Sequence, residues 1–495
     1  MNFASRVIAV LFLLCGSLVL LRLRNHSDSS QAFFRTSGRN NQGGCSGRLT
    51  RLKDLGIKFP IKYARRDIII KVNPDLDRSS LTQIDAPFLS EVQIVDPVQS
   101  PDWGLEQCSP PLTLEVPTFP RQPANASHVI FGISTYIKRM DDSIPHLQRS
   151  LAHTSARLIV LLIDSGEVTP DSKEMAALET RMRALGIEAT VVGAPKGSLM
   201  QVRYFSLVKI LYDNRDSATQ WISLLDDDTF LPSMHSLVNT LDTYDSSKEW
   251  YLGAMSEDWW SVMVYGMMSF GGGGTFLSIP TAAQINNNYD TCAERSTANQ
   301  GDIRVFECIT AHTTTKLQPV IGLHQADLGG DLSGFYESGR LPLSLHHWKT
   351  GWHFEQKPEQ RALNTYPMAK MHLVSDVCGD CFLQRWQFGS DTILSNGFSI
   401  STYPTQNALA ELVKNKEMDK VEDTFMPPRE VNSFMKGYEH SIGPLRPKVE
   451  GKIQYKFLDA KVEDGGVRQY YIYRALDKEP DIVYEIFWTR HEIHV

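Results

Sequence analysis

The fold is decided by residues 221–228, which read WISLLDDD. A short, mostly apolar run that is bounded by polar residues is typical of a buried strand. Ligands of open α/β sheets bind just beyond the carboxyl ends of such strands. This stretch therefore predicts a buried strand that carries three aspartates to a ligand-binding edge.

Similar apolar runs recur upstream, and they predict three more strands. These strands are expected at 128–134 (HVIFGIS), 157–163 (RLIVLLI) and 188–192. Helical patterns separate the strands, and strands that alternate with helices form a mostly parallel sheet with helices on both faces. The fold class expected for this part of the chain is therefore α/β.

The intervening helices have start and stop signals. Ser143 has the character of an N-cap before an apolar stripe, and a helix from Lys173 should close at Gly186. Residues 199–212 place apolar side chains along one face, and Ser233 is expected to cap a further helix.

The aspartates suggest metal chemistry. Asp226 and Asp228 should point to the same side, because side chains alternate along an extended segment. Neighbouring carboxylates repel each other unless a cation neutralises them, and hard oxygen ligands select Mg²⁺ or Mn²⁺. A solvated acidic turn or a helix cap is the plainer interpretation, and the sequence leaves it open.

A glycine-rich segment, FGGGGTFLS at 270–278, lies between apolar stretches. Flexible linkers are seldom surrounded by so much apolar sequence. We therefore expect a loop whose backbone approaches a substrate closely. The segment lacks the Gly-Lys-Ser/Thr end of a Walker loop and does not match the dinucleotide fingerprint.

Further polar candidates follow this loop. Asp302 begins an amphipathic segment, where an aspartate is often only a helix N-cap. His324 precedes Gln325, and His346 and His347 are adjacent. Single histidines are more often packed than ligating, but a histidine pair in a chain with a candidate metal site is a stronger candidate.

The order and spacing of these segments resemble the Fringe-like and beta-1,3-glycosyltransferase superfamily, particularly its fungal members. The resemblance covers residues 126–350. The segments that carry it are the strand with its three aspartates, 250–253 (WYLG), 256–260 (SEDWW), the glycine loop, 301–302 (GD), 323–327 (LHQAD) and 344–347 (SLHH). Gly301 is a departure, because family members often have an acid at that position.

This resemblance implies a GT-A fold, a UDP-sugar donor, Mn²⁺ (or Mg²⁺) as cofactor, inversion at the anomeric carbon and a type II Golgi topology. It also implies site roles. The implied metal ligands are Asp226, Asp228 and His346, and the implied base is Asp302; Asp227, Gly272, Gly273 and Gly274 would lie near the donor, and Glu257, Asp258, Trp259 and His324 would contact acceptor or donor.

The N-terminal residues predict a membrane anchor. Residues 7–21 are apolar apart from Gly16 and Ser17, and no clear cleavage site precedes Arg22. An uncleaved signal anchor is favoured over a cleaved signal peptide. Sequons at Asn25 and Asn125 would be used only in the lumen of the secretory pathway.

Six cysteines follow the anchor, an even number that fits an oxidising compartment. The pairs expected are Cys292 with Cys308 and Cys378 with Cys381, and buried free thiols remain the alternative. Cys45 and Cys108 have no assigned partner.

Four regions are expected. They are a cytoplasmic tail and anchor (1–24), a luminal stem and irregular lead-in (25–125), the GT-A catalytic domain (126–350) and a small β-rich C-terminal region (351–495). In the last region, Asn396-Gly397 signals a hairpin turn, and 470–473 and 482–488 are expected strands.

A formal charge of -7 without long runs of one sign argues against nucleic acid as a partner. The expected partners are a UDP-sugar, a glycan or glycoprotein acceptor and the membrane. Two other functions remain open. A catalytically silent, lectin-like binder would keep the fold, and a metal-dependent phosphohydrolase would use the aspartates but not the glycine loop.

Overall fold

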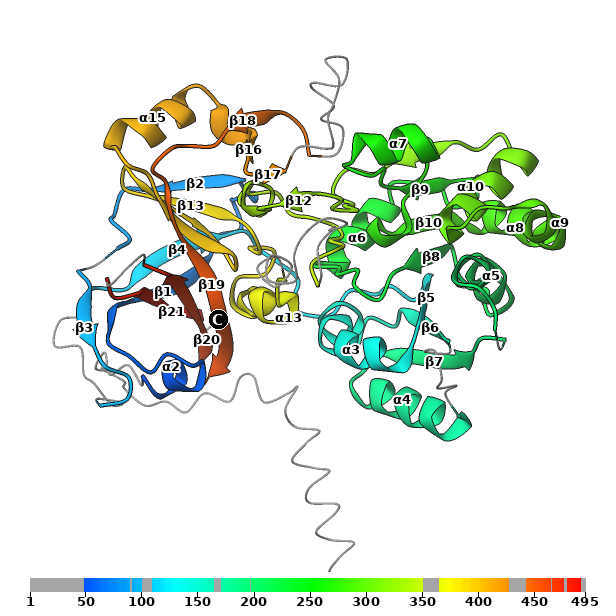
Figure 1. The fold of residues 1–495 in the computed structure, drawn as a ribbon, viewed down its shortest axis with the longest axis horizontal. Helices are drawn as coiled ribbons and strands as arrows, with labels where there is room; N and C mark the ends of the chain where they lie inside the picture. The colour runs from blue at the N-terminus through cyan, green and yellow to red at the C-terminus, as the bar shows by residue number, and fades with distance from the viewer. Residues whose placement is uncertain are drawn as a thin grey trace, which may run out of the picture.

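The computed structural model describes residues 49–89, 91–99, 109–163, 171–195, 197–349, 365–426, 442–463, 465–475 and 479–490. They form two lobes that lie side by side, an α/β lobe and a β-rich lobe (Figure 1). The predicted anchor, Asn25, Cys45 and Cys108 lie outside the described residues. Within these ranges, none of the helices has the length and apolar character that a membrane crossing requires.

The α/β lobe is built on a seven-stranded sheet in the order β11-β9-β10-β8-β5-β6-β7. Its strands are β5 (Val129–Thr135), β6 (Arg157–Leu162), β7 (Glu188–Gly193), β8 (Trp221–Leu225), β9 (Tyr251–Gly253), β10 (Thr275–Ser278) and β11 (Leu317–Pro319). The four strands expected from the sequence, β5 to β8, are confirmed and run parallel to one another, whereas β10 is antiparallel to β8. This is the GT-A-type, Rossmann-like α/β sheet that the resemblance implies.

Helices cover both faces of this sheet, as expected. They are α3 (Ile137–Leu151), α4 (Ser172–Ala184), α5 (Met200–Asp213), α6 (Met234–Leu241), α8 (Ile279–Asn287), α9 (Tyr289–Arg295) and α10 (Gly301–His312). Alternating residues of β5 divide between two cores: Phe131 packs with α3, α4 and α6, whereas Ile130 packs with α5, α8, α9 and α10. A strand buried on both faces explains why β5 is apolar throughout.

The expected start of α3 is wrong. The helix begins at Ile137, so Ser143 lies inside it and is not its N-cap. Proline is favoured in the first turn of a helix, so Ser143 two residues before Pro145 resembled a start signal. Instead, the Ser143 hydroxyl donates to the carbonyls of Arg139 and Asp227, each at 2.7 Å. It therefore ties α3 to the acidic turn after β8. The other signals are confirmed, because Ser233 caps α6 and Gly186 follows α4.

The β-rich lobe contains a ten-stranded sheet in the order β2-β13-β14-β15-β19-β20-β21-β1-β3, with β4 also paired to β1. Its strands are β1 (Ile61–Val72), β2 (Leu81–Ile84), β3 (Gln93–Val95), β4 (Leu112–Val116), β13 (Arg385–Phe388), β14 (Thr392–Ser395), β15 (Ser399–Thr402), β19 (Ile453–Glu463), β20 (Gly466–Tyr473) and β21 (Ile482–Arg490). A β-rich C-terminal region is thus confirmed. Gly397 lies in the β14–β15 turn with a φ of 82°, as the hairpin signal predicted.

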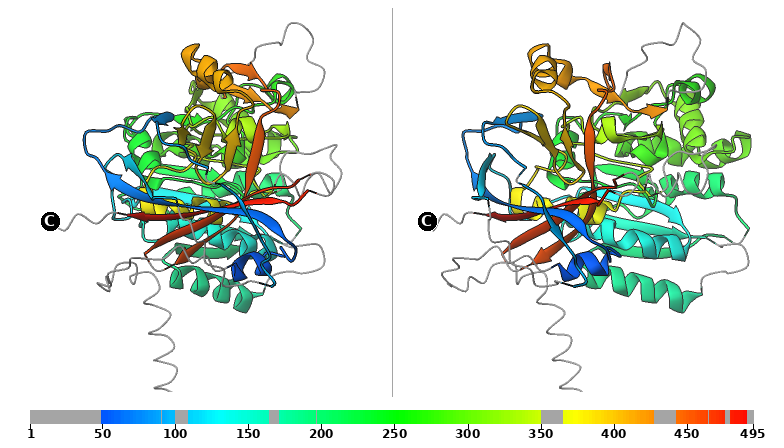
Figure 2. Two further views of the ribbon diagram at one scale, coloured as in Figure 1. Left: turned by 90° about the vertical axis from the view of Figure 1, so that its left-hand side faces the viewer. Right: turned by 60° about the vertical axis from the view of Figure 1, so that its left-hand side comes forward.

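The expectation of an irregular lead-in before residue 126 is wrong for the segment that forms β1 to β4. These strands belong to the same sheet as the C-terminal strands, and β1 runs parallel to β21 (Figure 2). The local pattern hid this pairing because β1 includes Arg65, Arg66 and Asp67. Arg66 is buried and donates to the carbonyls of Phe88 and Pro110 at 2.9 and 3.0 Å, so its charge is compatible with a core strand.

Smaller elements connect the lobes or decorate them. They are α2 (Thr50–Asp54), α7 (Trp259–Tyr265), α11 (Ser333–Tyr336), α13 (Met368–Met371), α14 (Ser375–Cys378), α15 (Gln406–Lys414), β12 (Gly329–Gly330), β16 (Val421–Asp423), β17 (Phe425–Met426) and β18 (Leu445–Pro447). Both expected disulfides, Cys292–Cys308 and Cys378–Cys381, are present.

The two lobes share a hydrophobic cluster next to the acidic turn. Phe230, two residues after the turn, is fully buried and packs edge-on against the rings of His372 and Phe382. Its backbone pairs with that of Leu345, immediately before the histidine pair. The β-rich lobe therefore supports, from behind, the two segments that carry the aspartates and the histidines.

Candidate active site

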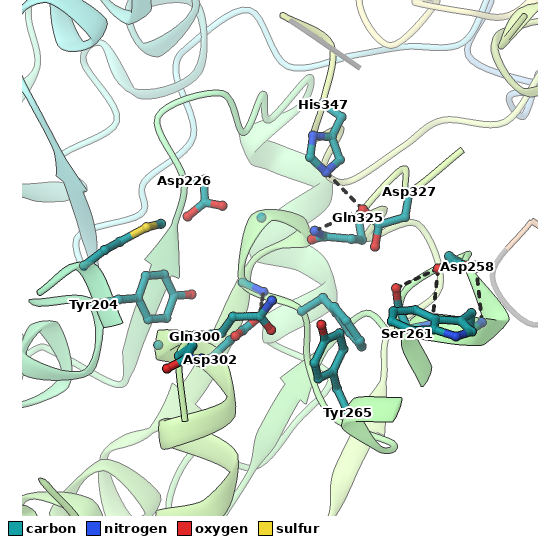
Figure 3. A pocket seen from close by; sticks show the side chains of 17 residues that line it. Tyr204, Asp226, Asp258, Ser261, Tyr265, Gln300, Asp302, Gln325, Asp327 and His347 are labelled. Atoms are coloured by element: carbon teal, nitrogen blue, oxygen red, sulfur yellow. Dashed lines mark hydrogen bonds and ion pairs between the residues drawn. The ribbon is translucent and has the colours of Figure 1, made fainter. Parts of the chain in front are cut away.

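A cavity of about 670 Å³ opens in the α/β lobe at the carboxyl end of β8 (Figure 3). Side chains from α5, the acidic turn, α7, the glycine loop, the start of α10 and the 325–347 segment line it. The lining residues that matter for its chemistry are Tyr204, Asp226, Asp258, Trp260, Gly271, Gly272, Asp302, Gln325, Asp327 and His347. The location agrees with the edge that the WISLLDDD stretch predicts.

Asp226 and Asp228 face the same histidine. The Nε2 atom of His346 lies 3.1 Å from Asp228 Oδ1 and 3.3 Å from Asp226 Oδ2. Burial opposes charge on both Asp228 and His346, but their mutual attraction outweighs it: the pKa of Asp228 is lowered and the pKa of His346 is raised. Asp226 and Asp228 thus point to the same side, as expected. A cation bound here would neutralise the two carboxylates in place of protonated His346.

Asp227 points the other way. Its carboxylate accepts from Arg139 Nε at 2.7 Å and from the Thr135 hydroxyl. It is buried, and it is absent from the described lining of the cavity. This geometry fits an anchor that fixes the turn to α3, and it offers the donor no free carboxylate, contrary to the role implied for Asp227.

The residues present fit a divalent cation. One ligand atom each from Asp228, His346 and His347 lies within 4.8 Å of the others. Carboxylate oxygen and imidazole nitrogen are both ligands of divalent cations, and Asp226 is close enough to His346 to add a second carboxylate. His347 was not among the ligands implied by the resemblance, and its adjacency to His346 was the only sequence signal for it.

The backbone brings the two histidines together. His347 has a φ of 53°, which is uncommon for a residue with a side chain, and the two imidazole centroids lie only 3.9 Å apart. His347 Nε2 also lies 3.0 Å from Asp327 Oδ1, and a carboxylate in that position orients an imidazole. The His347 ring is thereby held in the cavity wall.

The glycine loop divides into two parts. Gly271 and Gly272 line the cavity, and a Cβ on Gly272 would lie 2.1 Å from a ring atom of His346, so only glycine fits there. Gly273 donates its N–H to Gln325 Oε1 at 2.7 Å, and Gly274 has a φ of 94°. These last two glycines are absent from the described lining. They hold the loop in place, whereas the first two permit the close approach that the sequence predicts.

Asp302 lies across the cavity from His347 (Figure 3). It belongs to the first turn of α10, whose N-cap is Gln300, so the interpretation of Asp302 as an N-cap is wrong. Its carboxylate accepts from the N–H groups of Gly271 at 3.2 Å and Ile303 at 2.9 Å. Burial, reinforced by the nearby Asp226 charge and opposed by the Gly271 N–H, raises the pKa of Asp302 to about 6. Such a carboxyl accepts a proton readily near neutral pH.

The residues that the resemblance implies as acceptor or donor contacts do not all line the cavity. Glu257 and His324 are buried with 3.4 Å between Oε1 and Nδ1, and neither is among the described lining residues. Asp258 lines the cavity, but its carboxylate caps α7 by accepting from the N–H groups of Trp260 and Ser261, each at 3.2 Å. Glu257 and His324 therefore support the wall from behind.

Trp259 packs inward against the cluster around Phe270, whereas its neighbour Trp260 lines the cavity and is 40% exposed. One residue corresponds to about 100° around a helix axis, so adjacent positions of α7 face different surroundings. The sequence signal, two adjacent tryptophans, did not distinguish them. Tyr204, Gln325 and Asp327 also line the cavity, although none of them was an expected site residue. Gln325 and Asp327 belong to the 323–327 segment, whereas Tyr204 has no motif around it.

Two family models match the sequence. The Fringe-like model matches residues 179–328. A second family, described as a protein of unknown function, DUF604, matches residues 261–475 and is related to the first. A search of curated proteins finds no match.

Several solved glycosyltransferases show distant similarity. The mannosyltransferase PcManGT from Pyrobaculum calidifontis, in complex with GDP-Man and Mn²⁺, is 9% identical over 40% of this chain and 56% of its own length, with a TM-score of 0.28. Mouse xyloside xylosyltransferase 1, in its apo form, is 11% identical over 39% of this chain and 85% of its own, with a TM-score of 0.28. A glycosyltransferase involved in glycosylation of the major capsid of PBCV-1 is 12% identical over 48% and 97%, with a TM-score of 0.26.

TM-scores this low carry no argument about the activity of this chain, and membership of the fungal branch stays a prediction. The two family models are more informative, because their matches together span residues 179–475 and contain the acidic turn, the glycine loop, Asp302 and the histidine pair. The chain is therefore similar to the Fringe-like glycosyltransferase family over residues 179–328 and to the related DUF604 family over residues 261–475.

Proposed function

We propose that this chain is a metal-dependent, inverting hexosyltransferase that moves a sugar from a UDP-sugar to a hydroxyl of a glycan or glycoprotein acceptor, in a β-1,3 linkage as the family resemblance implies. One observation carries the proposal. Asp302, a carboxyl whose pKa is raised to about 6, shares a cavity with Asp226, while Asp228 and His346 meet at its edge. An inverting transfer needs a base and a leaving-group stabiliser, and these groups supply both.

The leaving-group side is formed by the acidic turn and the histidine pair. Asp228, His346 and His347 would hold Mn²⁺ (or Mg²⁺), with Asp226 as a further carboxylate. When bound, such an ion stabilises negative charge on a departing diphosphate. The protein's contribution is to fix the turn: Arg139 neutralises Asp227, and Ser143 donates to the Asp227 carbonyl.

The acceptor side is formed by Asp302. Its carboxylate would take the proton from the acceptor hydroxyl as that oxygen attacks the anomeric carbon from the face opposite the diphosphate. The new carbon–oxygen bond forms as the bond to UDP breaks, and the proton ends on Asp302. No covalent intermediate with the enzyme is needed. Removal of a general base usually lowers the rate by about 10²–10⁴.

We further propose that the chain is a single-pass type II protein of the Golgi membrane with its catalytic lobe in the lumen. The apolar N-terminal stretch supports an anchor. The disulfides Cys292–Cys308 and Cys378–Cys381 fit an oxidising compartment. Asn125, the second sequon, is exposed before β5 and is available for glycosylation. Deglycosylation of the protein from a secretory host, read as a mass shift that becomes smaller in Asn125→Gln, would test the luminal side.

A donor screen tests the activity. The full-length protein, purified from a secretory host, is incubated with UDP-glucose, UDP-galactose, UDP-N-acetylglucosamine or GDP-mannose, with Mn²⁺ or with chelator, and release of UDP or GDP is followed. We expect metal-dependent turnover of one UDP-sugar.

The two other functions give different results in the same screen. Metal-dependent UDP binding without turnover on any donor, even with a panel of glycan acceptors, would favour the silent binder. Hydrolysis of simple phosphate esters without transfer would favour the phosphohydrolase. Absence of any nucleotide binding would reject the transferase.

A further inference from the structure

Tyr204 of α5 is a buried residue of the cavity wall that the mechanism above does not use. Its side chain is only 6% exposed and lines the cavity between Asp226 and Asp302. In Figure 3 the phenol ring lies between these two carboxylates, and its hydroxyl is directed into the cavity. Within the described part of the chain, this hydroxyl has no hydrogen-bond partner.

The surrounding backbone leaves space for this phenol. A Cβ on Gly271 would lie 2.2 Å from the Tyr204 hydroxyl oxygen, and a Cβ on Gly301 would lie 2.3 Å from Tyr204 Cβ. Neither position could carry a side chain while the phenol stays where it is. Two glycines from different segments therefore flank one tyrosine, which fixes the direction of its hydroxyl.

The hydroxyl is available as a donor. Burial, reinforced by the charges of Asp226 and Asp302, raises the pKa of Tyr204 well above its ordinary value, so the phenol stays protonated. Thr275 has a hydroxyl near enough to lower this pKa slightly, but its hydrogen bond is with Ser269 Oγ at 2.7 Å. A buried hydroxyl without a partner is unfavourable, and a ligand in the cavity would satisfy it.

The place of Tyr204 indicates which part of a ligand it meets. In the proposed reaction the diphosphate lies at the acidic turn, and the acceptor hydroxyl lies at Asp302. The group between these two ends is the sugar that is transferred. Tyr204 lies between the same two ends, and the charges of both carboxylates raise its pKa.

We propose that the Tyr204 hydroxyl donates a hydrogen bond to a hydroxyl oxygen of the sugar being transferred and thereby helps to select the donor sugar. The inference rests on the proposed function and deepens it, because it concerns the sugar and not the nucleotide. A phenol fixed by two glycines discriminates between sugars that do and do not present an oxygen at that point.

The test is Tyr204→Phe in the full-length protein, a change that removes one oxygen atom. The affinities for UDP and for UDP-glucose, UDP-galactose and UDP-N-acetylglucosamine are measured by calorimetry with Mn²⁺, together with kcat/KM for the donor that is turned over. We expect kcat/KM and the affinity for that UDP-sugar to fall about 10-fold, the size typical of a buried hydrogen bond to a ligand, with UDP affinity unchanged.

Deoxy analogues of the same donor identify the contact. For the wild type, one deoxy-sugar donor should lose the same factor of about 10, and Tyr204→Phe should impose no further loss on that analogue. The matched control is Tyr251→Phe. Tyr251 is also buried, but its hydroxyl accepts from the Ser269 N–H at 2.8 Å, so its removal should leave the ranking of donor sugars unchanged.

Failures of the two proposals are distinguishable. If the wild type binds a UDP-sugar but Tyr204→Phe binds and uses it equally well, or loses UDP affinity by the same factor, the sugar contact is wrong while the transferase stands. If the wild type binds neither UDP nor any UDP-sugar, both proposals are wrong.

Discussion

The two lobes are built in opposite ways. In the α/β lobe, the four parallel strands β5 to β8 come from one continuous stretch of chain, with helices between them. In the β-rich lobe, the first and last long strands, β1 and β21, lie side by side although they are far apart in the sequence. Lys62 of β1, for example, pairs with Ile482 of β21. The first arrangement places loops at one sheet edge and creates a cavity there. The second arrangement pairs the first long strand of the lobe with the last, and the lobe supports the cavity edge of the α/β sheet by packing against Phe230.

This difference predicts that substitutions in the two lobes affect different properties. The β-rich lobe should respond mainly in stability, and the α/β lobe mainly in activity. Trp488 of β21 tests the first half. It is fully buried, packs against Trp386 with 5.8 Å between ring centroids, and donates to Gln469 Oε1 at 2.7 Å.

Trp488→Ala should lower the free energy of unfolding by about 3–5 kcal/mol, the range for truncating a buried aromatic side chain. Chemical denaturation of the purified protein measures this effect. The control is Phe59→Ala, because Phe59 is 42% exposed and its removal should cost little. An equal effect of the two substitutions would contradict the assignment of Trp488 to a core that stabilises the fold.

Asp228 tests the prediction that substitutions in the α/β lobe affect mainly activity. Asp228→Asn keeps the size of the side chain but removes the charge that faces His346. We expect Mn²⁺-dependent turnover to fall by about 100-fold or more, because loss of a metal ligand exceeds the 10–100-fold cost of losing an outer-shell partner. Titration of activity with Mn²⁺ measures it.

Glu249→Gln is the control for Asp228→Asn, since Glu249 is exposed and distant from the histidines in sequence. Asp228→Asn activity that reaches the wild-type level at ordinary Mn²⁺ concentrations would show that this carboxylate is not a ligand.

The pH dependence of activity concerns Asp302. Its folded-state pKa is raised to about 6, so below that pH it carries a proton and cannot accept another. We expect kcat/KM to rise as pH increases from 5 to 7 and then to level off. Near the low end, the change should approach about 10-fold per pH unit for a single essential base. A profile that falls over this range would contradict the assignment of Asp302 as base.

The same group also affects stability. A carboxyl whose pKa is higher in the folded state than the roughly 3.9 of an unfolded aspartate binds more protons when folded. Its contribution therefore makes the protein less stable as pH rises from about 4 to 6. Asp302→Asn should remove this trend and be more stable than the wild type at neutral pH, as thermal unfolding at pH 4.5 and 7 would measure.

The smallest effect is expected at the contact between the lobes. Arg149 of α3 donates to Asp376 of α14 at 2.7 Å, and both side chains are partly exposed. A double-mutant cycle with Arg149→Gln and Asp376→Asn should give a coupling energy of about 1 kcal/mol or less. Coupling above about 3 kcal/mol would mean that this ion pair, and not the cluster around Phe230, holds the lobes together.

Sequence patterns predicted the α/β lobe well because its strands and helices are contiguous and their periodicity is local. The buried strand 221–225 and the acidic turn were expected correctly, as was the shared direction of Asp226 and Asp228. Strands β1 and β2 were missed because their partners β21 and β13 lie hundreds of residues away, and β3 and β4 pair only with β1. The charged residues of β1 interrupt the alternation that would mark a core strand.

The candidate site was predicted only in part, for a similar reason. Residues with a motif around them, such as Asp226, Asp302 and His346, were identified. Tyr204 was not, because in sequence it is one more apolar position of α5, and only the fold brings it to the cavity wall beside Gly271 and Gly301. Whether Trp259 or Trp260 lines the cavity depends on how α7 is rotated, which no local pattern determines.

The most direct test of the account compares Asp302→Asn with Asp290→Asn on the UDP-sugar that the wild type uses, at pH 7 with Mn²⁺. Asp290 is an exposed aspartate of α9 and serves as a matched control. We expect Asp302→Asn to bind UDP as the wild type does and to lose about 10²–10⁴ in kcat, while Asp290→Asn keeps full activity. Wild-type turnover by Asp302→Asn would contradict the central claim that this carboxylate is the base of a sugar transfer.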